Sequence, residues 1–216
     1  MTPPRAATQP TPPTRLSLLL IALLATAAAP TPTITDLRPI PLQPGVNPID
    51  HLVPNGGPGL IVLAWRDNGN AWGYDTCTVL LQDHGRWQLA GIEHPAPKPG
   101  LDDDFALAAS DSPHTGEDAI TAIRFARAQL DGHPTTLLLE AIRTYPETPY
   151  DPAPTAYDVY ALTPNTEGPG RTTAYFRRIQ HQDLPAKYCH AEAALSQASG
   201  LPLRPSYGGK DTPTGC

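Results

Sequence analysis

Residues 121–144, TAIRFARAQLDGHPTTLLLEAIRT, decide the fold class of this chain. Side chains alternate along the first half of the stretch, which places Ile123 and Phe125 on one face of a strand. An Asp-Gly pair at 131–132 is typical of a hairpin turn, and the second half returns as another apolar strand. Helix propensity offers an alternative for the first half, but the turn between two matched segments favours a β-hairpin.

Further short β-type segments lie on both sides of this hairpin. They cover residues 59–65, 74–81, 86–92, 155–162 and 172–180. The turn residues DNGN join the first two into a second hairpin. One helix is expected over residues 188–199, where alanine and leucine recur at helical spacing before Gly200. We therefore expect a mainly β protein: a sandwich of stacked antiparallel sheets with a short C-terminal α-helix.

The N-terminal residues have the layout of a secretory signal. Arg5 and Arg15 precede an apolar run, LSLLLIALLATAAA, that contains an Ala-x-Ala cleavage site. The run is too short to cross a bilayer, which takes about 20 residues. The expected organisation is a signal peptide at 1–27, a flexible Pro-rich leader at 28–45, a β-sandwich domain at 46–205 and a C-terminal tail at 206–216. We expect a periplasmic or secreted protein with no transmembrane anchor after processing.

The charge balance bears on the class of partner. The formal net charge is −6 at pH 7. Nucleic acids and anionic membrane surfaces are bound by clustered lysine and arginine, so an acidic chain is a poor candidate for either. We therefore expect no nucleic-acid partner.

The three cysteines are Cys77, Cys189 and Cys216. In an oxidising compartment, one disulfide with one thiol left over is the simplest arrangement. We favour the Cys189–Cys216 pair, which would tie the tail to the helix, and the Cys77–Cys189 pair is the alternative. Cys77 lies in the apolar run TCTVLL, where a buried thiol behaves as a small hydrophobe.

The densest acidic cluster is Asp102, Asp103 and Asp104. Adjacent carboxylates on a loop can bind a hard cation through oxygen ligands, which makes these three the candidate metal ligands. No EF-hand spacing follows them, and a solvated surface loop is the competing interpretation. No cofactor is expected, apart from such a cation.

The loop HTGED places His114 beside Glu117 and Asp118, a combination suited to ligand binding or to general-base chemistry. No G-x-S-x-G, S-x-x-K or H-E-x-x-H signature accompanies it, so we expect no catalytic residues and no enzyme activity. Trp72, in a hairpin turn, and Arg124, on a strand, complete the candidate binding residues. Trp65 and Trp87 lie in strands and are expected in the core.

Several segments together resemble one known family. They are IVLAWRDNGNAWGYDTCTVLL, the loop HTGED with the hairpin that follows it, the strand YDVYAL, and FRRI with KYCHAEAALSQASGLP near the C-terminus. In this order, over residues 56–205, they resemble the carbapenem intrinsic-resistance family of exported proteins. The resemblance implies stacked antiparallel sheets with short terminal helices, a fold similar to periplasmic inhibitors of invertebrate-type lysozyme.

The resemblance also implies a function. The family is associated with protection against carbapenems without β-lactamase motifs, and it includes a homodimer with a bound cation. We therefore expect an exported, non-enzymatic protein that protects the cell envelope by binding, with a β-lactam or an envelope protein as its ligand. The alternatives are an inhibitor or interaction module for another envelope protein, and a hydrolase built on His114 and Glu117. The inhibitors' Ser-Gly-x-x-Tyr loop has no match, because SGLPL at 199–203 lacks the tyrosine.

Overall fold

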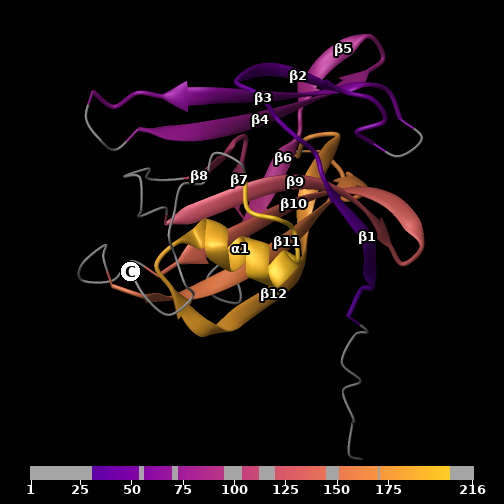
Figure 1. The fold of residues 1–216 in the computed structure, drawn as a ribbon. Coiled ribbons are helices and arrows are strands. Elements are labelled where there is room, and N and C mark those ends of the chain that lie inside the picture. The colour runs from indigo at the N-terminus through magenta and orange to yellow at the C-terminus, as the bar shows by residue number, and fades with distance from the viewer. Residues whose placement is uncertain are drawn as a thin grey trace, which may run out of the picture. The chain divides into compact units, whose positions relative to one another are not determined.

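The computed structural model describes residues 31–53, 56–69, 73–94, 104–111, 120–144, 151–169 and 171–204. Within these ranges the chain is mainly β, with two sheets and one short helix near the C-terminus, which confirms the predicted fold class. Figure 1 shows the strands β2 to β5 above the strands β9 to β12.

Among the described residues, the larger sheet has seven strands. In spatial order they are β1 (Ile34–Pro39), β9 (Thr121–Leu130), β10 (His133–Arg143), β11 (Ala153–Pro164), β12 (Ala174–Tyr188), β6 (Gly91–His94) and β7 (Asp104–Ala106). The predicted hairpin is confirmed as β9 and β10, joined at the Leu130–His133 pair. Neighbouring strands are antiparallel except β12 and β6, which run parallel and pair Tyr175 with Gly91.

The smaller sheet has five strands in the part of the chain that the structure describes. In order they are β2 (Gly45–Ile49), β3 (Gly59–Arg66), β4 (Tyr74–Asp83) and β5 (Arg86–Leu89), and β8 (Ala109–Asp111) pairs with β4. The second predicted hairpin is confirmed as β3 and β4. Every pairing in this sheet is antiparallel.

One apolar core joins the two sheets. The smaller sheet contributes Ile61 and Val79, and the larger contributes Phe125 and Phe176, whose rings make an edge contact. The predicted alternation of side chains along β9 is confirmed, because Ile123 and Phe125 face this core. The positions that alternate with them along β9 face the opposite side of the larger sheet.

The helix α1 (Ala191–Ser199) covers that opposite side of the larger sheet (Figure 1). Its Ala194 and Leu195 are fully buried in a second core, against residues such as Ala126 and Leu139. Gly200 ends the helix in a left-handed conformation, φ 72°, and its N–H donates to Ser196 O at 2.9 Å. The predicted helix is thus confirmed, beginning three residues later than expected. No helix in the described ranges has the length and apolar character needed to span a membrane.

Three strand predictions need correction. Residues 34–39, expected in a flexible leader, form the edge strand β1, because Ile34 and Leu37 pack against the second core. Residues 86–92 are two strands in different sheets, since the chain crosses over at the buried Ala90. The last strand, expected to end at residue 180, continues along β11 to Tyr188.

The placement of two tryptophans also differs from the prediction. Trp65 is 57% exposed and Trp87 is 45% exposed, although both lie in strands. Trp87 pairs with Gln82, so it points away from the core, and Trp65 lies near the end of β3 beside Gly73. Alternation alone could not show that the outer face of the smaller sheet has no covering layer in the described residues.

Candidate functional site

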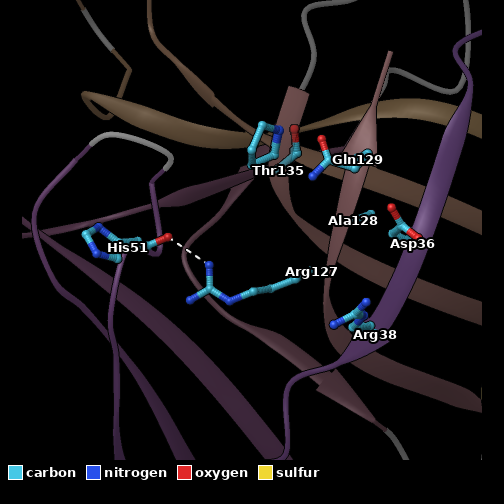
Figure 2. A pocket seen from close by; sticks show the side chains of 8 residues that line it. Asp36, Arg38, His51, Arg127, Ala128, Gln129 and Thr135 are labelled. Carbon is cyan, nitrogen blue, oxygen red and sulfur yellow. Dashed lines mark hydrogen bonds between the residues drawn. The ribbon is translucent and has the colours of Figure 1, made fainter. Parts of the chain in front are cut away.

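A surface pocket of about 540 Å³ lies beside the edge strand β1. It is lined by Asp36, Arg38, His51, Arg127, Ala128, Gln129, Pro134 and Thr135. Strand β1, the β9–β10 hairpin and the turn after β2 supply these residues (Figure 2). The volume falls in the range of about 300–1,000 Å³ that is usual for small-molecule sites.

Two arginines lie opposite each other in this pocket. Arg38 of β1 is the register partner of Arg127 of β9 on the neighbouring antiparallel strand. Directly opposed side chains project from the same face, and two like charges in that position destabilise the pairing. Neither guanidinium forms an ion pair with a carboxylate of the described residues, including Asp36 in the same pocket.

The guanidinium of Arg127 is held by the turn that follows β2. Its Nη1 donates to the carbonyl of His51 at 3.0 Å, and its Nη2 donates to the carbonyl of Asp50. Figure 2 shows the side chain extending from β9 across the pocket to His51. These bonds use two of the five N–H groups of the guanidinium, which leaves the others for a ligand.

The backbone of the pocket is strained at two positions. Asp36 and His51 both adopt left-handed conformations, with φ of 53° and 52°. Non-glycine residues rarely adopt this conformation, and strained backbone occurs preferentially at functional sites. Both strained residues line the same pocket as the paired arginines.

A smaller cavity, of about 140 Å³, lies between β6, β8, β9 and β10. Glu140, 8% exposed, lines it together with polar residues that include His94 and Ser110. Tyr160 Oη donates a hydrogen bond to Glu140 Oε2 at 3.1 Å. Burial raises the pKa of Glu140 to about 7, and the nearby Asp158 also raises it, while the Tyr160 bond acts in the opposite direction. This carboxyl can therefore give or take a proton near neutral pH.

Asp158 continues the same row of side chains across the sheet. It pairs in register with Glu140 on one side and with His181 on the other. Its Oδ1 lies 2.6 Å from His181 Nδ1, and its Oδ2 lies 3.7 Å from Arg178 Nη1. The guanidinium of Arg178 compensates part of the charge of the buried Asp158.

Arg124, a predicted binding residue, is buried under the helix. Its Nη2 is paired with Glu192 Oε1 of α1. Glu192 Oε2 also accepts from Arg204 Nε at 3.2 Å, and Arg204 Nη2 lies 3.0 Å from Asp111 Oδ2. The two arginines and two carboxylates balance each other, so this network accounts for Arg124 without a ligand.

The remaining predicted residues lie largely outside the described ranges. This applies to His114, Glu117, Asp118, Trp72, Asp102, Asp103 and Cys216. Asp104 is described: it opens β7, is exposed, and its Oδ1 accepts the N–H of Phe105 at 2.8 Å. No three His, Cys, Asp or Glu side chains among the described residues are grouped to hold a metal ion.

Cys77 is a free thiol and 3% exposed, as expected for a small buried hydrophobe. This argues against the Cys77–Cys189 alternative. The favoured Cys189–Cys216 pair involves a residue outside the described ranges and stays a prediction.

Sequence reasoning missed both cavities. Arg38 had no signal, because Pro-rich surroundings hid its strand and its burial pattern has no regular alternation. Glu140 did have a sequence signal, since it is the single charged residue in the apolar run LLLEAI. A carboxylate at a core-facing position of a strand indicates a functional or strongly perturbed group.

The fold and pocket together define a two-sheet β-sandwich protein with a helix on the outer face of the larger sheet and a charged pocket beside its edge strand. The chain is similar in structure to CarG, known from a crystal structure, with a TM-score of 0.53 and 18% sequence identity. The similarity covers 73% of this chain and 92% of CarG. At this identity the likeness shows a shared fold. No family model and no curated protein matches the sequence.

Proposed function

We propose that this chain is an exported, non-enzymatic protein that protects the cell envelope by binding a small molecule, with a carbapenem as the first candidate. The sequence resemblance to the carbapenem intrinsic-resistance family supplies the ligand class. The chain has the stacked-sheet fold that this resemblance implies, and it shares that fold with CarG. The observation that carries the binding role is the pocket of about 540 Å³ beside β1.

The chemistry of the pocket favours binding over turnover. The described residues that line it include no serine or cysteine, and they form no carboxylate–imidazole hydrogen bond that would activate a nucleophile. Opening a β-lactam requires an activated nucleophile or a bound, activated water. The free thiol of Cys77 is a poor nucleophile as well, because burial raises its pKa to about 12.

The test is expression of the chain with residues 1–27 in a susceptible Gram-negative host. We expect a higher tolerance to imipenem, with no loss of drug beyond one equivalent per purified protein. The matched control is the same chain without residues 1–27, which should remain in the cytoplasm and give no tolerance. N-terminal sequencing of the periplasmic fraction should find a start near Ala28, and an intact Met1 in the membrane fraction would contradict export.

Drug consumption separates binding from hydrolysis. A His114→Ala/Glu117→Ala variant removes the candidate base and carboxylate of the HTGED loop. Under the binding proposal this variant keeps its tolerance if its melting curve is unchanged. Multiple-turnover loss of imipenem that the double substitution abolishes would overturn the proposal in favour of a hydrolase.

One observation favours a second candidate, an interaction module for another envelope protein. The outer face of the smaller sheet exposes Val46, Trp87 and Leu89, at 62%, 45% and 36%. Their register partners, Val62, Gln82 and Leu80, lie on the same outer face. Exposed aromatic and aliphatic side chains of this kind are typical of protein contacts.

Substitution on that face tests the second candidate. Under the small-molecule proposal, Trp87→Ser with Leu89→Ser leaves carbapenem tolerance unchanged. Loss of tolerance in a variant that remains folded and still binds imipenem in vitro would favour the interaction module.

A further inference from the structure

We propose that Arg38 and Arg127 form an anion-recognition site that binds the carboxylate of a small organic acid. This inference rests on the proposed binding function and names its recognition chemistry. It is argued from the register, hydrogen bonds and charges of the pocket in Figure 2.

The first step is the unfavourable charge arrangement without a ligand. Arg38 and Arg127 are directly opposed across β1 and β9, where like charges destabilise strand pairing. Asp36 lines the same pocket, but no ion pair joins it to either arginine in the described structure. Two cations against one carboxylate leave the pocket positive in a chain whose formal net charge is −6. A bound anion would remove this repulsion.

The second step is the orientation of the donors. Two backbone carbonyls, of Asp50 and His51, hold the Arg127 guanidinium in place before any ligand arrives. A guanidinium fixed in this way loses little side-chain entropy on binding, which favours affinity. Arg38 is exposed and makes no hydrogen bond through its side chain within the described residues, so its planar fork is free to close on the same anion.

The third step is the size and polarity of the rest of the pocket. A volume of about 540 Å³ exceeds what a single inorganic anion fills, and it accommodates an organic body attached to a carboxylate. Gln129 and Thr135 supply further hydrogen-bonding groups, and Pro134 supplies an apolar contact. The lining thus suits a small acid with both polar and apolar parts. Carbapenems are of this class, because they carry a ring carboxylate.

The test is an NMR titration of the purified protein with sodium benzoate, benzamide and inorganic phosphate. Benzamide is a neutral analogue of benzoate, in which an amide NH2 group replaces one carboxylate oxygen. We expect benzoate to shift the signals of Arg38, His51 and Gln129, and benzamide to leave them unchanged. Phosphate shifting these signals without any effect of benzoate would overturn the assignment to an organic acid.

Three charge-removing variants make the test specific. Arg38→Gln and Arg127→Gln should each weaken benzoate binding at least about tenfold, the usual scale for a lost charge-assisted contact. The matched control is Arg86→Gln, an exposed arginine of β5 that does not line the pocket and carries the same change of charge. If Arg86→Gln weakened benzoate binding as much as the pocket variants do, the proposed site would be overturned, because the loss of affinity would then reflect the net charge of the protein alone.

A loss of folding stability in the variants can be told apart from a loss of benzoate binding. Arg127→Gln loses the two carbonyl contacts and can unsettle the turn, whereas Arg38→Gln removes no hydrogen bond of the described residues. An unchanged affinity in Arg38→Gln would therefore overturn the proposal by itself. Arg127→Lys keeps the charge without the fork, and its affinity should lie between those of the native protein and Arg127→Gln.

The same variants separate this inference from the proposed function. If the native protein binds benzoate at the arginines but gives no imipenem tolerance, the anion site stands and the protective function fails. If tolerance is present and survives in folded Arg38→Gln and Arg127→Gln variants, the protective function stands and the anion site fails.

Discussion

Tyr160 donates a hydrogen bond of 3.1 Å to Glu140, and this pair lies in the interior between the two sheets, with the two residues only 1% and 8% exposed. The hydrogen bond favours the ionised carboxylate, but burial outweighs it and raises the pKa of Glu140 to about 7. The ionisable groups near Glu140 are Asp158 beside it, and Arg178 and His181 beyond Asp158. His94 lines the same cavity.

The first prediction concerns the pH dependence of stability. In the unfolded chain Glu140 ionises near 4.5, whereas in the folded protein it keeps its proton up to about 7. The folded state therefore binds the proton more tightly, and the free energy of unfolding falls as pH rises from 4.5 to 7. The full difference for this group is about 3 kcal/mol, present below pH 4.5 and lost above pH 7. Urea denaturation at pH 5 and pH 8 measures it.

Glu140→Gln isolates the contribution of this group. Glutamine can still accept the Tyr160 hydrogen bond and has no charge to bury, so the variant should be more stable than the native protein at pH 8 and similar at pH 5. Glu167→Gln, on an exposed carboxylate, is the control and should leave the difference between the two pH values unchanged. An unchanged pH dependence in Glu140→Gln would show that other groups cause it.

How far the sequence predicts this fold is clear from two hairpins. The β9–β10 and β3–β4 hairpins are confirmed because their signals are local: alternating side chains on either side of turn residues. Strand β1 could not be predicted in this way. Its proline-containing sequence has no alternation, and it is held by pairing with β9, far away in the chain, and by Asp131, whose Oδ1 accepts the N–H of Thr33.

The pocket could not be predicted from the sequence, for a related reason. Arg38 and Arg127 meet only because β1 pairs with β9, and the carbonyl that holds Arg127 belongs to the left-handed His51. Neither long-range register nor backbone conformation at a non-glycine residue has a signature in one sequence. The acidic loops that composition made conspicuous lie mostly outside the described residues, so their roles stay predictions.

The second prediction concerns the close approach of Gly59 to Leu52. A Cβ at position 59 would lie 2.3 Å from Leu52 Cδ2 and 2.7 Å from Leu52 Cβ, and Leu52 is fully buried. We expect Gly59→Ala to lower the free energy of unfolding by about 1–3 kcal/mol through overpacking. In a Leu52→Ala background the same change should cost less, because the contact with Leu52 Cδ2 is gone and only the contact with the Cβ at position 52 remains. A double-mutant cycle by urea denaturation measures this coupling, and additive effects would contradict it.

The third prediction concerns the cysteines. Burial, followed by Asp111 and Asp75, raises the pKa of Cys77 from 9.0 to about 12, which lowers its thiolate fraction roughly 10³-fold. Native protein should therefore resist iodoacetamide at Cys77 at pH 8, and denatured protein should react readily. Non-reducing peptide mapping should find Cys189 linked to Cys216. A Cys77–Cys189 peptide, or rapid labelling of native Cys77, would contradict this assignment.

The last prediction concerns the ionic network beneath α1. Glu192, 3% exposed, is shared by Arg124 and Arg204, and burial, with a smaller contribution from Arg204, lowers the pKa of Arg124 to about 10. Glu192→Ala leaves the buried Arg124 without its carboxylate, and removing one partner of a buried ion pair costs about 3–5 kcal/mol. Replacing both partners, with Arg124→Met and Glu192→Leu, should recover much of that loss, because no uncompensated charge stays buried.

A matched surface pair sets the scale for this comparison. Glu167 and Arg171 form a partly exposed ion pair, with the Arg171 side chain 28% and the Glu167 side chain 40% exposed, so Glu167→Ala should change the free energy of unfolding by no more than about 1 kcal/mol. Urea denaturation of the three variants at pH 7 gives the comparison. If Glu192→Ala costs no more than Glu167→Ala, the network does not hold α1 on the sheet. If the double variant is less stable than Glu192→Ala, packing at this position depends on the charged pair itself.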